Sequence, residues 1–260
     1  MKIALGQVVG APEDVAANLV IGETLAGRAA EAGAQVLVLP ELFLTGYNIG
    51  DAIDRLAEPS DGPAAQAVAK IATAAGLAIV YGYPERTVEG VYNSAAVIGA
   101  NGALLANYRK VCLWGGFEGR HFRPGTESAA VDLGGLRFDL QICYDLDFPE
   151  LSRAAARSQA DAVLCISATS APYTVVPRHL VPARAYENQL FVVFCDRCGT
   201  ERGLTYAGES CVAAPDGSYL ATGGADEALL FAEIDAARYA EFVRDHRPGA
   251  LQLPAPNPRA

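Results

Sequence analysis

Histidine is scarce in this sequence, because only His121, His179 and His246 occur among 260 residues. None of the three stands where an apolar strand ends, and no His-x-x-x-His or His-Glu pair is present. No serine lies in a Gly-x-Ser-x-Gly frame, so a Ser-His-Asp triad has little support. A metal hydrolase has even less support, because a zinc site needs several closely spaced ligands and the three histidines are far apart in the sequence.

Basic residues and long apolar runs are also few. The chain has 20 Lys and Arg against 30 Asp and Glu, a formal net charge of −10, which disfavours nucleic acid and anionic membrane as partners. The longest uncharged stretch, Gly90 to Tyr108, contains asparagines and glycines and does not resemble a bilayer span. No basic segment followed by a long apolar run begins the sequence. We therefore expect no export signal and a cytoplasmic protein with reduced cysteines.

The overall composition is typical of a folded chain with a large core, since 51% of residues are hydrophobic and 19% are charged. No central linker or repeat interrupts it, so we expect one domain over 1–250. The proline-rich segment 251–260 reads as an extended C-terminal arm.

Helical and strand patterns alternate in the first half, and hairpin patterns are mixed in. Helices are expected at 15–32, 63–75 and 149–158, with another from 182. Strands are expected at 3–9, 36–39, 77–83, 91–98, 103–108, 136–142, 162–166, 190–194, 206–213, 218–222 and 228–234. This order predicts a layered α/β fold with mixed sheets.

Three reactive side chains stand just after expected strands, where α/β proteins usually bind ligands. Glu41 follows Leu39-Pro40, and burial there would raise the proton affinity of its carboxylate, which suits a general base near neutral pH. Lys110 follows the hairpin and could stabilise an anionic intermediate. Cys143 stands at a strand-to-helix turn whose backbone N–H groups would serve as an oxyanion hole. Taken alone, Glu41 and Lys110 are more typical of solvated strand ends, and a buried structural thiol is the alternative for Cys143.

Together these segments resemble the nitrilase, or carbon–nitrogen hydrolase, superfamily, which uses Glu, Lys and Cys in this chain order. The fragments that carry the resemblance span nearly the whole chain. They are Pro40-Glu41-Leu42-Phe43, Gly46-Tyr47, Tyr92-Asn93-Ser94, Tyr108-Arg109-Lys110, Phe122-Arg123-Pro124-Gly125, Ile142-Cys143-Tyr144-Asp145, Phe148-Pro149-Glu150, Arg184-Ala185-Tyr186-Glu187-Asn188 and Ala214-Pro215-Asp216-Gly217.

The resemblance implies roles for particular residues. Cys143 matches the nucleophile, Glu41 the general base and Lys110 the cation that supports the tetrahedral intermediate. Glu118 matches a second, substrate-positioning carboxylate, and the backbone N–H of Tyr144 would complete the oxyanion hole. The resemblance also implies a four-layer αββα sandwich, a homodimer or higher homo-oligomer, a small-molecule amide as substrate, and no metal or organic cofactor.

Within the superfamily the sequence is most similar to short aliphatic amidases, in particular the 5-aminopentanamidases, which hydrolyse ω-amino amides. Nitrilases and N-carbamoyl amide hydrolases with the same triad are alternatives. Asp147 stands where many members have arginine, and it could hold a cationic substrate end, be solvated or cap a helix. The candidate pocket walls follow strand ends and are Tyr47, Trp114, Ala168 and Tyr173.

Two non-hydrolytic alternatives remain open. One is a regulatory protein that kept the fold, which the intact Glu41, Lys110 and Cys143 argue against. The other is a thiol redox sensor that pairs Cys143 with Cys112 or Cys165. The pair Cys195 and Cys198 is a lone Cys-x-x-Cys and is expected to be packing thiols, because no second ligand pair accompanies it.

Overall fold

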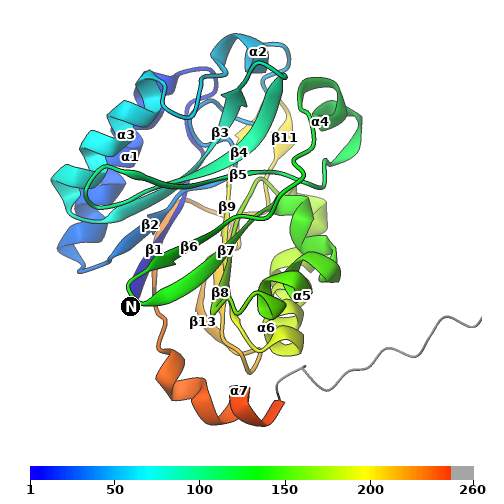
Figure 1. Ribbon diagram of the computed structural model, residues 1–260. Helices are drawn as coiled ribbons and strands as arrows, with labels where there is room; N and C mark the ends of the chain where they lie inside the picture. Colours follow the sequence, from blue (N-terminus) through cyan, green and yellow to red (C-terminus); the bar gives the residue numbers. More distant parts are fainter. Residues whose placement is uncertain (247–260) are drawn as a thin grey trace, which may run out of the picture.

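Two six-stranded sheets stacked face to face form the centre of the molecule, as Figure 1 shows. The structure is a computed structural model, and it describes residues 1–246. The strand order is β14-β1-β2-β3-β4-β5 in the first sheet and β13-β12-β9-β8-β7-β6 in the second. A separate two-stranded hairpin, β10-β11, stands outside both sheets.

The strands of the first sheet and of the second occupy separate parts of the chain, except for β14. The strands are β1 (Lys2–Gln7), β2 (Val36–Val38), β3 (Ala78–Arg86), β4 (Val91–Ile98), β5 (Leu104–Arg109), β6 (Ala130–Leu133), β7 (Leu136–Ile142), β8 (Ala162–Ser167), β9 (Phe191–Asp196), β10 (Thr200–Glu201), β11 (Leu204–Thr205), β12 (Cys211–Ala213), β13 (Tyr219–Thr222) and β14 (Ala228–Glu233).

The helices connect and cover these strands. The α-helices are α1 (Val15–Glu31), α2 (Ala52–Leu56), α3 (Pro63–Ala75), α4 (Gly115–His121), α5 (Pro149–Arg157), α6 (Val181–Asn188) and α7 (Ala240–His246). The shorter 3-10 helices are η1 (Cys143–Asp147), η2 (Ala171–Tyr173) and η4 (Ala236–Tyr239), and η3 (Val176–Leu180) is a π-helix.

Each sheet has a parallel centre and antiparallel edges. The strands β1, β2 and β3 are parallel neighbours in the first sheet, and β7, β8 and β9 are parallel neighbours in the second. The carboxyl ends of parallel neighbours meet at one edge of their sheet. Side chains that follow β2, β7 and β8 are therefore brought to sheet edges where a site can form.

The core consists of three apolar layers, and the alternation of side chains along the strands assigns residues to them. In β2, Val36 and Val38 pack between the two sheets, whereas Leu37 pairs with Leu39 on the opposite face against α1 and α3. A third layer packs α5 and α6 against the outer face of the second sheet. Figure 1 shows α1 and α3 on one side of the molecule and α5 and α6 on the other. The predicted four-layer αββα sandwich is confirmed.

Local sequence signals explain where the first two long helices begin and end. The side chain of Asp14 accepts a hydrogen bond from the backbone N–H of Ala17 at 2.9 Å and so caps α1. Pro63 stands at the first position of α3, where its missing N–H costs nothing. Gly76 ends α3 with φ of +66°, a left-handed conformation that glycine adopts without strain. These predicted bounds are confirmed to within a residue.

Two predicted elements differ from the structure. The strand expected over 206–213 is shorter, because Gly208 and Glu209 both have positive φ and interrupt the extended backbone, so that β12 begins only at Cys211. The helix expected from Pro182 is preceded by the π-helix η3, which continues directly into α6. The predicted arm 251–260 and the last residues of the predicted domain, 247–250, lie outside the described residues, so the single-domain boundary stays a prediction.

Among the described helices, none combines the length and the apolar character that crossing a bilayer requires.

Candidate active site

A cavity of about 260 Å³ opens beside the carboxyl ends of β7 and β8. Its wall contains Cys143, the candidate nucleophile, and six other residues that the sequence suggested as oxyanion or substrate contacts or as walls. The lining residues are Tyr47, Trp114, Cys143, Tyr144, Asp147, Ala168, Thr169, Ser170, Tyr173, Val175, Val176 and Leu204. This volume suits a small organic molecule rather than a polymer.

Glu41 lies behind this cavity and is held by a close approach of two backbone segments. Its side chain is completely buried. Gly82 in β3 donates its N–H to the carbonyl of Pro40, and a Cβ at Gly82 would lie 2.3 Å from the backbone nitrogen of Leu42. Only glycine allows this contact, so the sequence of β3 helps to fix where the Glu41 carboxylate stands.

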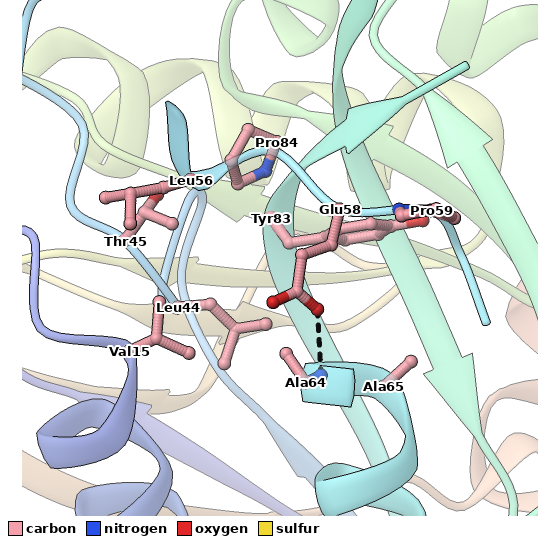
Figure 2. Close-up of a pocket in the computed structure, with 10 residues that line it drawn as sticks. All are labelled: Val15, Leu44, Thr45, Leu56, Glu58, Pro59, Ala64, Ala65, Tyr83 and Pro84. Atoms are coloured by element: carbon pink, nitrogen blue, oxygen red, sulfur yellow. Dashed lines mark hydrogen bonds between the residues drawn. The ribbon is translucent and has the colours of Figure 1, made fainter. Parts of the chain in front are cut away.

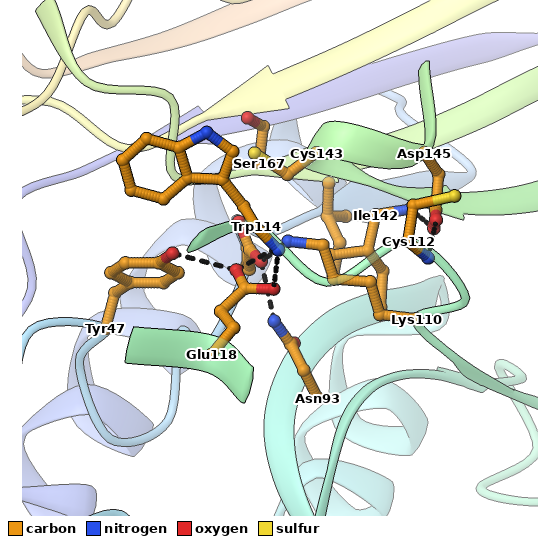
Figure 3. Close-up of polar contacts among 12 residues, drawn as sticks. Tyr47, Asn93, Lys110, Cys112, Trp114, Glu118, Ile142, Cys143, Asp145 and Ser167 are labelled. Atoms are coloured by element: carbon orange, nitrogen blue, oxygen red, sulfur yellow. Dashed lines mark hydrogen bonds and ion pairs between the residues drawn. The ribbon is translucent and has the colours of Figure 1, made fainter. Parts of the chain in front are cut away.

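Lys110 stands between two carboxylates. Its Nζ lies 2.8 Å from Oε1 of Glu41 and 2.7 Å from Oε1 of Glu118, and all three side chains have no exposed surface. The amide of Asn93 donates a further hydrogen bond of 2.6 Å to Oε1 of Glu41. Figure 3 shows Lys110 and Asn93 approaching this carboxylate cluster from below Cys143. Within residues 1–246, Oε2 of Glu41 is buried and has no hydrogen-bond partner, so this oxygen is available to receive a proton.

Glu118 is fixed from two further directions. Its Oε1 accepts a hydrogen bond of 2.8 Å from the hydroxyl of Tyr47, and its Oε2 accepts one of 2.8 Å from the backbone N–H of Trp114 (Figure 3). Tyr47 and Trp114 also line the cavity. Glu118 therefore connects two residues of the cavity wall to the Lys110 ammonium through charge-assisted hydrogen bonds.

Burial and neighbouring charges shift the proton affinities of this cluster. Burial raises the pKa of Glu41, and the charge of Glu118 adds to the rise although Lys110 opposes it. Burial lowers the pKa of Lys110, but the charges of Glu41, Cys143 and Glu118 outweigh burial and hold that pKa well above its ordinary value. Lys110 therefore stays an ammonium across the physiological range, and Glu41 becomes a stronger base than an exposed carboxylate.

Cys143 occupies a sharp turn directly after β7. Its φ is +48°, a left-handed conformation that is rare outside glycine, asparagine and aspartate. Asp145 braces the turn, because one of its carboxylate oxygens accepts hydrogen bonds from the backbone N–H of Ile142 and from the hydroxyl of Tyr108. Its other oxygen accepts one from the backbone N–H of Cys112. A strained conformation supported in this way is common at functional sites.

The thiol of Cys143 is coupled electrostatically to the buried cluster. Burial and the charge of Glu41 raise the pKa of Cys143, while Lys110 lowers it. The resting side chain is therefore a protonated thiol, and a thiol of this kind is a nucleophile only after a base has removed its proton. Tyr144 follows in the first turn of η1, where backbone N–H groups have no partner within the helix.

Asp147 is the only charged residue in the described wall of the cavity. It is half-buried, and burial raises its pKa while Arg184 opposes the rise. The guanidinium of Arg184 is bonded elsewhere, to the carbonyl oxygens of Leu146 and Asp147 and to the carboxylate of Glu187 at 3.0 Å. Arg184 is thus paired with Glu187, and Asp147, a residue of the cavity wall, has no salt-bridge partner among the described residues.

Aromatic side chains form the outer part of the wall. Trp114 and Tyr173 meet edge to face with ring centroids 6.0 Å apart, and both are partly exposed. Ala168, the residue after β8, is a further part of the wall. The predicted wall residues are thus brought together.

A second hollow, shown in Figure 2, lies between α3 and β3 and is lined by residues such as Leu44, Glu58 and Tyr83. Its volume of about 10 Å³ holds at most one water molecule. Oε2 of Glu58 accepts a hydrogen bond of 2.8 Å from the backbone N–H of Ala64 and so caps α3. This hollow is therefore part of the helix packing.

Within the described residues, no three His, Cys, Asp or Glu side chains are grouped in a way that could hold a metal ion.

Sequence reasoning missed four residues that support the site: Asn93, Asp145, Thr169 and Arg197. Arg197 is completely buried, and its guanidinium donates to the carbonyl oxygens of Glu41 and Leu42. Asn93 and Asp145 stand inside fragments that carry the family resemblance, which was an available signal. No local pattern singled out Thr169 or Arg197, because their roles arise from contacts between distant segments.

Comparison with known proteins gives consistent results. The family described as carbon-nitrogen hydrolase matches residues 2–244. A curated relative from Pseudomonas protegens, named hydrolase in pqqF 5'region, is 44% identical over 95% of this chain and 90% of the relative. An (R)-stereoselective amidase from a Pseudomonas species is 36% identical over 95% of this chain and 92% of that protein.

Solved structures that resemble this chain also include an amidase. An amidase of the nitrilase superfamily from Nesterenkonia superposes with a TM-score of 0.87 and 35% sequence identity, covering 94% of this chain and 96% of that one. One structure of that amidase contains butyramide bound to a variant that lacks a cysteine. Another shows covalent addition of the acetamide moiety of fluoroacetamide at its active-site cysteine.

Proposed function

Since this chain belongs to the carbon–nitrogen hydrolase family, we propose that it is an amidase that converts small aliphatic amides to carboxylic acids and ammonia. It is a hydrolase of carbon–nitrogen bonds other than peptide bonds. The observation that carries the proposal is the buried cluster of Glu41, Lys110 and Glu118, electrostatically coupled to a cysteine at a strained turn in the cavity wall.

The reaction begins with the transfer of the Cys143 proton to Glu41. The buried Oε2 of Glu41 receives the proton, while Oε1 stays bonded to Lys110 and Asn93. The transfer keeps the net charge of the cluster unchanged, because the sulfur gains the negative charge that the carboxylate loses. The sulfur then forms a bond with the amide carbonyl carbon, and the π electrons of the carbonyl move to oxygen.

Two groups stabilise the resulting oxyanion. The Lys110 ammonium, kept charged by its carboxylate neighbours, provides a cation. The backbone N–H of Tyr144 provides a hydrogen-bond donor at the start of η1. Glu41 then gives its proton to the amide nitrogen, the carbon–nitrogen bond breaks, and ammonia departs from a thioester on Cys143.

Hydrolysis of the thioester repeats the same steps with water as the nucleophile. Glu41, again a carboxylate, takes a proton from water as the water oxygen attacks the thioester carbonyl. Collapse of the second tetrahedral intermediate breaks the carbon–sulfur bond, and Glu41 returns the proton to sulfur. Glu118 holds Lys110 and Tyr47 in place through both halves of the cycle.

The substrates we favour are amides with a cationic ω-amino end, as the resemblance to 5-aminopentanamidases implies. The support within the cavity is Asp147, its only charged lining residue in the described chain. An ammonium near Asp147 would offset the effect of burial on that carboxylate. We expect kcat/KM for 5-aminopentanamide to exceed that for valeramide, and Asp147→Asn to remove this difference while valeramide turnover changes little. Equal kcat/KM for the two amides with the wild-type protein would contradict the ω-amino preference.

The proposal as a whole is tested by ammonia release from a panel of small amides, nitriles and N-carbamoyl compounds. We expect release from amides, and Cys143→Ala should abolish it while Cys165→Ala, which alters a buried thiol outside the cavity lining, should retain it. Release from nitriles alone would assign the chain a nitrilase activity, and a nitrilase from Pyrococcus abyssi is 37% identical over 82% of this chain. Release from N-carbamoyl compounds alone would favour the carbamoyl hydrolase alternative. No release, with reversible oxidation of Cys143, would favour a redox sensor.

We also propose that the enzyme is a cytoplasmic homodimer or a higher homo-oligomer. All six cysteines are free thiols, which is the usual state in a reducing compartment. Exposed aromatic side chains on the α5–α6 side, Tyr186 and Phe148, offer apolar surface for a second copy. Light scattering coupled to size-exclusion chromatography measures the oligomeric state, and a monomer at micromolar concentration would contradict the proposal.

A further inference from the structure

Two hydroxyl side chains stand beside Cys143 at the end of the neighbouring strand. In the parallel pairing of β7 with β8, Ile142 lies opposite Ile166. The next residue along β7 is Cys143, and the next along β8 is Ser167, the last residue of that strand. Figure 3 shows Ser167 next to Cys143, on the side opposite Lys110. Thr169 follows two residues later, lines the cavity and is 6% exposed.

These side chains form a continuous series of hydrogen bonds that ends at the nucleophile. Oγ1 of Thr169 lies 3.7 Å from Sγ of Cys143, within hydrogen-bonding distance for sulfur. Oγ of Ser167 lies 2.8 Å from Oγ1 of Thr169. The backbone N–H of Thr169 donates to Oγ of Ser167 at 3.1 Å. The Ser167 hydroxyl also bonds to the Cys143 sulfur and to the Asp196 carboxylate, and it lowers the pKa of both groups. Thr169 is therefore one of the acceptors open to the Ser167 proton.

The direction of these bonds follows from the chemistry of the sulfur. A thiolate has no proton and can only accept hydrogen bonds. When the Cys143 proton has moved to Glu41, the Thr169 hydroxyl must therefore donate to sulfur if the contact is kept. Ser167 can then donate to Thr169, so that both hydroxyl groups are satisfied in the state in which the thiolate is present.

The backbone on both sides of Thr169 is held in place. Its N–H also donates to Oδ1 of Asp196 at 2.8 Å, and its carbonyl accepts from the N–H of Ala207 at 2.8 Å. Asp196 is completely buried and lies opposite Ser167 in the parallel pairing of β8 with β9. The hydroxyl of Thr169 is thus placed before the reaction begins, and little reorganisation is required when charge develops on sulfur.

The need for such a donor follows from the environment of the thiol. Burial and the charge of Glu41 both raise the pKa of Cys143, so formation of the thiolate is unfavourable in the resting site. The Lys110 ammonium and the Ser167 hydroxyl oppose this effect. Lys110 is already bonded to two carboxylates, and Ser167 has a single proton for the sulfur, Thr169 and Asp196. A hydroxyl donor that contacts only the sulfur and Ser167 would stabilise the thiolate without competing for those bonds.

We propose that Thr169 is a further catalytic residue of this site, whose hydroxyl donates a hydrogen bond to the Cys143 sulfur while the thiol proton resides on Glu41, with Ser167 and Asp196 as positioning residues. No covalent bond to Thr169 forms or breaks. The sulfur–hydrogen bond of Cys143 breaks, an oxygen–hydrogen bond forms on Glu41, and Thr169 keeps its own proton throughout. The inference rests on the proposed function, in which Cys143 is the nucleophile.

The test compares Thr169→Val, which keeps the shape but removes the hydroxyl, with Thr169→Ser, which keeps the hydroxyl. The first readout is the rate constant for alkylation of Cys143 by iodoacetamide across the neutral to alkaline range, with the modified residue identified by peptide mass mapping. Loss of a hydrogen bond to a charged sulfur should slow alkylation roughly ten-fold in Thr169→Val. The pH profile should move by about one unit toward alkaline pH, and Thr169→Ser should stay near the wild-type profile.

The second readout is steady-state turnover of an amide that the wild-type protein hydrolyses. We expect kcat to fall roughly ten-fold in Thr169→Val with little change in KM, because the bond forms only with the thiolate. A folded Thr169→Val protein with wild-type alkylation and wild-type kcat would overturn the role of Thr169. Equal losses in Thr169→Val and Thr169→Ser would also overturn it, since they would show that packing alone matters.

A separate result identifies failure of the underlying function. If Cys143→Ala keeps full turnover, Cys143 is not the nucleophile and the proposed function fails together with the inference. If Cys143→Ala is inactive and Thr169→Val behaves as wild type, only the inference fails.

Discussion

Glu118→Gln is the substitution that isolates the contribution of the second carboxylate. The side chain accepts three hydrogen bonds, from Lys110 and Tyr47 at Oε1 and from the backbone N–H of Trp114 at Oε2. A glutamine has one oxygen and one NH2 group. Whichever way the amide is turned, its NH2 group must face a donor that the carboxylate accepted.

The magnitude follows from the bond that is lost. If the amide oxygen takes the Oε1 position, the NH2 group faces the N–H of Trp114, and if it is turned over, the NH2 group faces the Lys110 ammonium. Each arrangement removes at least one charge-assisted hydrogen bond, which contributes about 1.5–3 kcal/mol. If this loss falls on the transition state, kcat/KM should decrease roughly ten- to hundred-fold.

The assay is ammonia release from an amide substrate, together with far-UV circular dichroism to confirm folding. Removing the charge of Glu118 also removes one of the effects that raise the pKa of Glu41, so the acidic limb of the kcat/KM profile should move to lower pH. A folded Glu118→Gln protein with kcat/KM within about two-fold of wild type and an unchanged pH profile would refute this reasoning, since such a change is below the expected loss.

Two further substitutions test the surroundings of the site. Gly82→Ala places a methyl group against the backbone at Glu41 and Leu42, so we expect a loss of about 1–3 kcal/mol in urea unfolding and a fall in kcat; unchanged values of both would contradict the close approach. Burial raises the pKa of Asp139 from 3.8 to about 6, so its contribution to stability is complete below 3.8 and is lost as pH rises through 6. As pH rises from 3.8 to 6, the free energy of unfolding of Asp139→Asn should therefore increase by up to about 3 kcal/mol relative to that of the wild-type protein. A difference between the two free energies that does not change with pH would argue against this.

The main layers of the fold could be predicted from the sequence because their signals are local. Asp14, Pro63 and Gly76 mark helix ends through capping and backbone conformation, which depend on a few neighbouring residues. The strand over 206–213 was predicted too long because an apolar pattern does not reveal two consecutive residues with positive φ. The hairpin β10-β11 is too short to produce a pattern of its own.

The site shows the same division between local and long-range information. Glu41, Lys110 and Cys143 could be singled out because each follows an apolar strand, and the family resemblance added Glu118 and Tyr144. Burial could not be predicted from the residues alone, and Glu41 and Lys110 taken singly resembled solvated strand ends. They are buried because each neutralises the other, a fact that depends on residues 69 positions apart in the chain.

Thr169 and Arg197 illustrate what lay beyond prediction. Thr169 meets Cys143 because β7 and β8 are parallel neighbours in a particular register. Arg197 supports the backbone at Glu41 from a segment 156 residues away. Neither contact has a signature in the composition or periodicity of its own segment.

The central claim is that Cys143 carries the acyl group during turnover, and intact-protein mass spectrometry after rapid acid quench tests it most directly. With an amide substrate in excess, the wild-type protein should gain the mass of the amide less that of ammonia, and peptide mapping should place the gain on Cys143. Cys143→Ala should show neither the adduct nor ammonia release. Full turnover by Cys143→Ala, or an acyl group mapped to another residue, would contradict the account.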